Sequence, residues 1–177
     1  MPAANDSYDS LLAELAIPHR AKAAHRELLK RGLAALPAAR RGLRHANADV
    51  RYWCCQYLDR FLEAEALGDL ISMLADPDPR VRVSTLHTLV CDRCKEGDCR
   101  PEERDVLPRA LGLLARDPDA HVRALAVELV GQWVRTSREA LAAVEQAMKA
   151  DSSPTVRKKA AWYAPGGAIY RRTAPAA

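Results

Sequence analysis

The sequence predicts an all-α protein built from stacked helix pairs, because a turn recurs along the chain with an apolar stripe on either side of it. The turn is marked by four Val-Arg pairs at intervals of 31, 41 and 34 residues: Val50-Arg51, Val81-Arg82, Val122-Arg123 and Val156-Arg157. Three residues before each Val stands a side chain that can accept the backbone N–H groups of a helix start: Asn47, Asp78, Asp119 and Ser153. Each turn therefore predicts where a helix begins.

Each predicted helix carries an apolar stripe that it cannot bury alone. After each turn, small or apolar residues recur four, five and eight positions beyond the Val, as a helix with one buried face requires. Before each turn, apolar pairs seven residues apart mark another helix: Leu36/Leu43, Leu67/Leu74, Leu107/Leu114 and Leu141/Met148. Two helices and a turn thus form one unit, and such units must stack side by side to make a core. We expect the Arg of each turn to pair with an Asp of an adjacent turn.

The repeated pattern divides the chain into three parts. Residues 1–32 hold apolar positions for one or two helices, broken at Pro18, and are predicted to form an N-terminal helical cap. The repeat array spans 33–164 with an insert at 90–103, whereas 165–177 lack periodicity and are predicted to be an extended tail. The 177 residues show neither a secretory signal pattern nor an apolar run of membrane length. We therefore expect a cytoplasmic protein that does not contact the membrane.

The turns resemble those of the HEAT repeat family, in particular the short bacterial HEAT-like repeats of PBS-lyase type. The resemblance covers 33–164 and is weakest in the first unit, where Pro37 and Gly42 fall in the first helix. The segments that carry it are ADPDPRVR at 75–82, RDPDAHVR at 116–123 and ADSSPTVRKKAA at 150–161. It implies a right-handed α-solenoid of about four HEAT-like helix pairs behind the helical cap.

The connection at 90–103 is seven to nine residues longer than its counterparts and holds three of the five Cys. If the preceding helix continues to about Glu96, four donors can approach one another: His87, Cys91, Cys94 and Cys99. Thiolate and imidazole are ligands of tetrahedral zinc and, less often, of iron–sulfur sites, so the spacing predicts one structural zinc ion per chain. Two other interpretations stay open: surface thiols in a reducing compartment, or a thiol redox sensor flanked by Arg93, Lys95 and Arg100.

A second candidate site is an aromatic face on the helix that begins after Asn47. Its members stand at i, i+3, i+4 and i+7, off the core stripe of that helix: Trp53, Gln56, Tyr57 and Arg60. Trp, Tyr and Arg dominate protein-binding hot spots, so we expect an unidentified protein partner on this concave face. The alternative is partial burial against the neighbouring repeat. Cys54 and Cys55 fall on the stripe itself and are expected in the core.

Positive charge gathers at both ends of the chain. Residues 1–48 carry a net charge of +4, 49–151 carry −5 and 152–177 carry +5. The last of these segments holds four candidate anion-binding residues interleaved with aromatic residues: Lys158, Lys159, Arg171 and Arg172. Such a pattern suits single-stranded nucleic acid, which gives an alternative function. The other interpretation is a C-terminal cap in which Trp162 and Tyr163 cover the end of the array.

The motifs of common enzyme classes are absent from the sequence. It contains no Gly-rich phosphate loop and no nucleophile elbow, and it lacks the His-Glu dipeptides of HEAT-like di-iron hydroxylases. The sequence therefore predicts a non-enzymatic protein-interaction or scaffold module whose Cys/His insert binds structural zinc.

Overall fold

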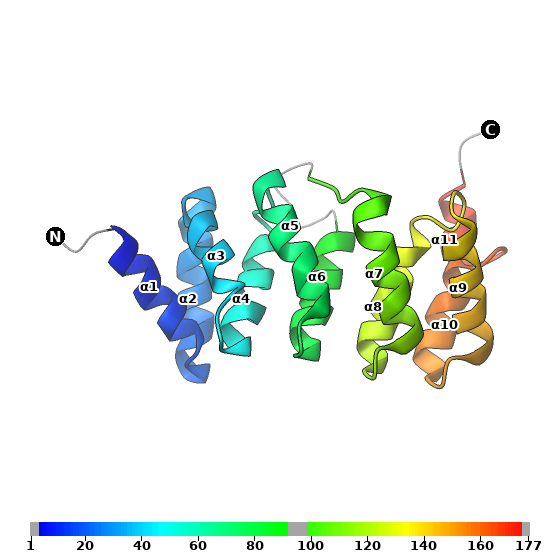
Figure 1. Ribbon diagram of the computed structural model, residues 1–177, viewed down its shortest axis with the longest axis horizontal. Coiled ribbons are helices and arrows are strands. Elements are labelled where there is room, and N and C mark those ends of the chain that lie inside the picture. Colours follow the sequence, from blue (N-terminus) through cyan, green and yellow to red (C-terminus); the bar gives the residue numbers. More distant parts are fainter. Residues whose placement is uncertain (1–3, 92–98, 175–177) are drawn as a thin grey trace. The chain divides into compact units, whose positions relative to one another are not determined.

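The computed structural model describes residues 4–91 and 99–174, and over these residues all regular secondary structure is helical (Figure 1). The helices fall into two compact units, Met1–Arg100 and Pro101–Ala177. Among the described helices, none combines the length and apolar character that a membrane span requires.

The unit Met1–Arg100 is a succession of helix pairs. Its elements are α1 (Ala4–Leu15), α2 (Pro18–Lys30), the 3-10 turn η1 (Gly32–Ala35), α3 (Leu36–Gly42), α4 (Ala48–Leu58), α5 (Ala64–Ser72), the 3-10 turn η2 (Met73–Ala75) and α6 (Pro79–Val90). Helix α1 packs against α2, α3 against α4, and η2 against α6. The second helices of the pairs, α2, α4 and α6, also contact one another in that order. Leu15, Leu28, Leu58, Leu70 and Leu86 are fully buried between these layers.

The unit Pro101–Ala177 repeats the same arrangement. Its elements are α7 (Glu103–Arg116), α8 (Ala120–Gly131), α9 (Arg138–Ala150), α10 (Pro154–Tyr163) and α11 (Ala168–Arg172). Helix α7 packs against α8 and α9 against α10, while α8 also packs against α10. The core between them includes Val122, Leu129, Val144 and Val156, all fully buried. The predicted all-α class is therefore confirmed for the described residues.

The helix starts lie where the turns predicted them. Asn47, Asp78 and Asp119 each accept the backbone N–H two residues ahead, at 2.7, 2.8 and 2.7 Å. Helix α10 also begins at its predicted position, but the Ser153 side chain accepts no helix N–H there. This start is instead favoured by Pro154, whose fixed φ suits the first helical position.

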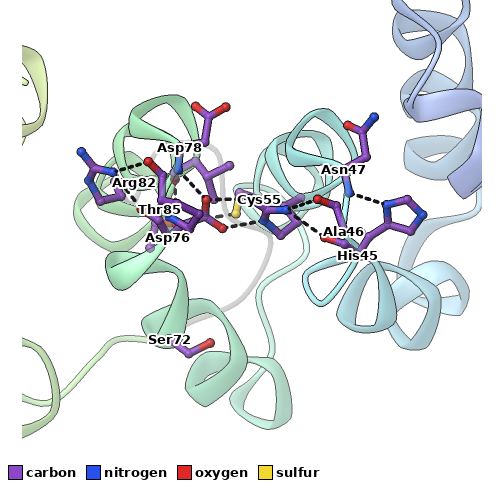
Figure 2. Close-up of polar contacts among 12 residues, drawn as sticks. His45, Ala46, Asn47, Cys55, Ser72, Asp76, Asp78, Arg82 and Thr85 are labelled. Atoms are coloured by element: carbon purple, nitrogen blue, oxygen red, sulfur yellow. Dashed lines mark hydrogen bonds and ion pairs between the residues drawn. The ribbon is translucent and has the colours of Figure 1, made fainter.

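The Arg of each turn has a recurring set of acceptors. Arg51 donates to both carboxylate oxygens of Asp76 at 2.6 and 2.9 Å, so a predicted pairing between adjacent turns is confirmed in this unit. Arg82 donates to the backbone carbonyls of Asp76 and Pro77, which precede its own helix. Figure 2 shows Arg82 reaching back to Asp76, with Cys55 beside Thr85. These contacts tie each turn to the helix that follows it.

Two predicted elements are wrong. Helix α6 ends at Val90 and Cys91 is already extended, with φ −84° and ψ 114°, so Cys91 does not continue the helix that carries His87. The tail 165–177 is not wholly extended, because α11 forms within it. That short helix is held by tertiary contacts that sequence periodicity does not encode: it packs on α10, and Arg135 lies 3.8 Å from the centroid of the Tyr170 ring and donates to the Tyr170 carbonyl.

Candidate functional site

Three potential metal-binding side chains meet at the ends of α4 and α6. Asp59, His87 and Cys91 each place one donor atom so that all three atoms lie within 4.8 Å of one another. Asp59 is the C-cap residue of α4, His87 lies in the last turn of α6, and Cys91 is the C-cap residue of α6. The group thus offers one carboxylate oxygen, one imidazole nitrogen and one sulfur.

Asp59 has an unusual environment for a carboxylate. Its Oδ1 atom is buried and has no hydrogen-bond partner among the described residues. Nε2 of His87 lies 3.7 Å from this atom, on a side chain that is half exposed. Asp59 also lies at the C-terminal end of α4, where the backbone already carries partial negative charge. A buried carboxylate oxygen in such a place is costly unless a cation accompanies it.

The predicted zinc ligands are brought together only in part. His87 and Cys91 belong to the group, Cys94 lies outside the described residues, and Cys99 is described but is no member of it. The sequence reasoning missed Asp59, which comes from the preceding helix pair. A signal for it was present, because an acidic residue at a helix C-terminus opposes the helix dipole and therefore calls for a specific partner.

Cys54 and Cys55 are core residues, as the stripe predicts. Both are fully buried. Burial raises the pKa of the Cys54 thiol above its ordinary range and that of Cys55 to about 12, so neither forms a thiolate at neutral pH. The Cys55 sulfur lies 3.6 Å from the Thr85 hydroxyl. These two thiols are therefore unsuited to redox sensing.

A pocket of about 300 Å³ opens beside the N-terminal ends of α2, α4 and α6. Its lining is Leu15, Pro18, Ala21, Asp49, Tyr52, Trp53 and Arg80. Tyr52 meets Trp53 edge to face, with ring centroids 5.2 Å apart, and His25 lies against Trp53 at 5.0 Å. Arg80 donates to Asp49 at 2.8 Å. The pocket lining therefore combines apolar and aromatic residues with one charged pair.

His25 lies against the Trp53 ring beside this pocket. Burial lowers its pKa below the ordinary value, and a hydrogen bond to the Gln56 backbone acts in the other direction. Its Nε2 atom is buried and has no hydrogen-bond partner in the described part of the chain.

The four residues predicted for the partner-binding face have different environments. Trp53 is partly exposed and lines the pocket, while Gln56 is partly buried and donates to Ser84 at 3.0 Å. Arg60 is exposed, with its guanidinium 5.4 Å from the centroid of the Phe61 ring. Tyr57 was wrongly placed, because it is fully buried and donates to the Gly32 carbonyl at 2.7 Å. It stands seven residues after Val50, the spacing of one helix face, and that signal marks it as core.

The C-terminal cations have partners of several kinds. Lys158 lies 5.9 Å from the centroid of the Trp162 ring, and Lys159 pairs with Glu128. Arg171 donates to the Gly166 carbonyl, and Arg172 is exposed. Three of the four predicted anion-binding side chains thus remain at the surface, whereas Lys159 is neutralised by a carboxylate.

No protein-family model matches this chain, and no curated protein matches it.

Proposed function

We propose that the chain is a protein-interaction scaffold: a right-handed α-solenoid of HEAT-like helix pairs whose second helices form the binding surface. The recurrence of capped turns and the packing of α2 on α4 and of α4 on α6 support this proposal. Small-angle scattering tests the solenoid, because a stacked array has a radius of gyration above the roughly 16 Å of a compact domain of this length. A value near 16 Å would contradict it.

The observation that carries the proposed function is the aromatic pocket at Trp53. Trp and Tyr supply large apolar contact area together with a polar edge, and pockets lined by them anchor many protein partners. The pocket volume of about 300 Å³ is sufficient for one large side chain and part of its neighbours.

The charge around the pocket favours an acidic partner. Lys22 and Arg26 are exposed on α2, one helical turn apart. Lys22 follows Ala21, which lines the pocket, and Arg26 follows His25, which contacts Trp53. Arg80 of the pocket lining is offset by its ion pairs with Asp49 and Asp78, so the positive charge beside the pocket comes from Lys22 and Arg26. We therefore infer that the pocket takes a large apolar side chain of an acidic peptide segment.

A peptide selection tests this function directly. Peptides enriched from a random display library on the immobilised full chain should be acidic and should contain Trp, Phe or Leu. Replacement of Trp53 by Ala should weaken their binding at least tenfold, about 1.4 kcal/mol. The matched control is Trp162→Ala, which removes an exposed Trp on α10 and should leave the affinity unchanged.

Two results would contradict the proposed function. One is enrichment of basic peptides, which the exposed Lys22 and Arg26 should repel. The other is equal affinity for the parent protein and the Trp53→Ala variant, with far-UV circular dichroism showing that the variant is folded.

A second candidate function is binding of single-stranded nucleic acid by the C-terminal helices. It is supported by Trp162, of which 41% is exposed, with Lys158 near its ring. Arg171 and Arg172 are exposed on α11. A partly open aromatic ring beside cations is what base stacking with phosphate contact requires.

A further inference from the structure

We propose that Asp59, His87 and Cys91 bind a zinc ion that joins the C-terminal ends of α4 and α6. This site lies apart from the Trp53 pocket along both helices. The pocket is lined by residues from the first two turns of α4 and the first turn of α6, whereas the site lies at their C-terminal ends. The inference does not depend on the proposed peptide-binding function. It also changes the ligand set that the sequence predicts, because a carboxylate from the preceding helix pair replaces a thiol of the insert.

The electrostatics of the two helix ends favour a cation at this position. Asp59 caps α4 and Cys91 caps α6, so the C-terminal carbonyl groups of both helices approach the group. Each helix end contributes partial negative charge, and the Asp59 carboxylate adds a full one. No basic residue lies in the last turn of α4 to offset this charge. A divalent cation would satisfy it.

The buried oxygen of Asp59 provides an independent argument. Oδ1 is buried without a hydrogen-bond donor in the described structure, although desolvating a carboxylate oxygen is unfavourable. Its 3.7 Å separation from His87 Nε2 is longer than a hydrogen bond. A metal ion between the two atoms would bind both.

The donor types select zinc. Imidazole nitrogen, thiolate sulfur and carboxylate oxygen are the three ligand types found in protein zinc sites, whereas magnesium and calcium are bound by oxygen alone. In a tetrahedral site, sulfur and nitrogen ligands lie about 3.5 Å apart. The present separations, up to 4.8 Å, must therefore shorten by about 1 Å. Because the His87 side chain is half exposed, rotation of its ring can supply this movement.

Such an ion would add a metal link between two helix pairs that already meet through apolar packing and through polar contacts such as Gln56–Ser84. Asp59 belongs to α4, while His87 and Cys91 belong to the next second helix, α6. Zinc binding should therefore stabilise the α4–α6 interface and raise the melting temperature of the unit Met1–Arg100.

The test is titration of the reduced, metal-free full chain with Co²⁺, followed by competition with Zn²⁺. We expect one ion per chain and a sulfur-to-cobalt charge-transfer band that disappears in Cys91→Ser. The variants Asp59→Asn and His87→Ala should each lower zinc affinity at least tenfold. His121→Ala, at an exposed position on α8, is the control and should bind as the parent does. Zinc should raise the melting temperature of the parent and of this control only.

The outcomes separate the proposed site from its alternatives. Asn is nearly isosteric with Asp, so Asp59→Asn should remain folded. This variant therefore still tests the site if Cys91→Ser fails to fold. If Asp59→Asn binds zinc as tightly as the parent while a Cys94→Ser/Cys99→Ser double variant loses it, the ion is held by the insert and the proposal is wrong. Zinc that binds equally to the parent and all ligand variants would be adventitious and would also overturn it.

Discussion

Arg123 and Asp151 form a two-point ion pair between α8 and the turn that precedes α10. The guanidinium Nε and Nη2 atoms donate to the two carboxylate oxygens at 2.8 and 2.9 Å. The same guanidinium donates to the carbonyl of Asp117 at 2.9 Å, in the turn before its own helix. The pair Arg51–Asp76 repeats this geometry between the first and second turns, within Met1–Arg100. One Arg thus links two successive turns of the repeat.

Removal of this Arg should destabilise the C-terminal unit strongly. In Arg123→Ala the buried Asp151 carboxylate loses its cation, which should cost about 3 kcal/mol in the free energy of unfolding. Urea denaturation followed by circular dichroism measures the change. Arg138→Ala, at an exposed position on α9, should change stability by less than about 0.5 kcal/mol. Equal stability of the two variants would show that the pair contributes nothing.

The same pair makes stability depend on pH in the acid range. Hydrogen bonding from Arg123 lowers the pKa of Asp151 below its ordinary value of 3.8. The unfolded chain therefore binds this proton more readily, so the stabilisation is complete above about pH 5 and is lost as pH falls from the unfolded value through the lower value of the folded protein. Unfolding measured from pH 7 to pH 3 should show this loss, and Asp151→Asn should show a smaller one. An identical slope in the two proteins would rule out this origin.

Gly131 leaves room for the ring of Tyr163. A Cβ atom added at Gly131 would lie 2.7 Å from both Cγ and Cε1 of that ring, too close for packed carbon atoms. Gly131→Ala should therefore cost about 1–3 kcal/mol, although Ala is the better helix former. The control is Gly112→Ala on α7, where the nearest atom is 3.8 Å away and the change should stabilise. In a Tyr163→Ala background the cost of Gly131→Ala should largely vanish, and its persistence would locate the strain elsewhere.

Tyr57 should contribute to the stability of the fold and not to the binding of a partner peptide. Its hydroxyl donates to the Gly32 carbonyl at 2.7 Å, at a residue with φ of +56°. Tyr57→Phe leaves that carbonyl without this donor and should cost about 1 kcal/mol of unfolding free energy. Tyr52→Phe, at the pocket wall, is the matched control and should cost less. If Tyr57→Phe weakened peptide binding without a loss of stability, Tyr57 would belong to the partner-binding face after all.

Salt dependence tests the nucleic-acid alternative. If Lys158, Arg171 and Arg172 each contact one phosphate, the logarithm of the affinity for single-stranded DNA should fall with that of salt concentration with a slope of about −2. The double variant Arg171→Glu/Arg172→Glu should abolish binding. Arg138→Glu/Lys149→Glu on α9 makes the same charge change at exposed positions and serves as control. Equal weakening by both double variants would indicate a general charge effect without a C-terminal site.

The helix starts could be predicted because they depend on contacts within a few residues. Asp78 and Asp119 bond to N–H groups two residues ahead, so the sequence pattern is sufficient to place α6 and α8. The period of the apolar stripes is equally local, and it identified the buried faces that carry Val81 and Val122. Tyr57 was assigned to the wrong face, because it lies at the edge of its stripe.

The membership of the candidate metal group was decided by the tertiary structure. Asp59 and His87 are 28 residues apart in the sequence, and their proximity depends on how far α4 is shifted along its axis relative to α6. The end of α6 at Val90 and the contact between Gly131 and Tyr163 have the same origin. The sequence by itself therefore determined which residues begin helices and which faces are apolar, since both follow from short-range hydrogen bonding and helical periodicity. Which side chains of different helices face one another was decided only by close packing of the helix pairs.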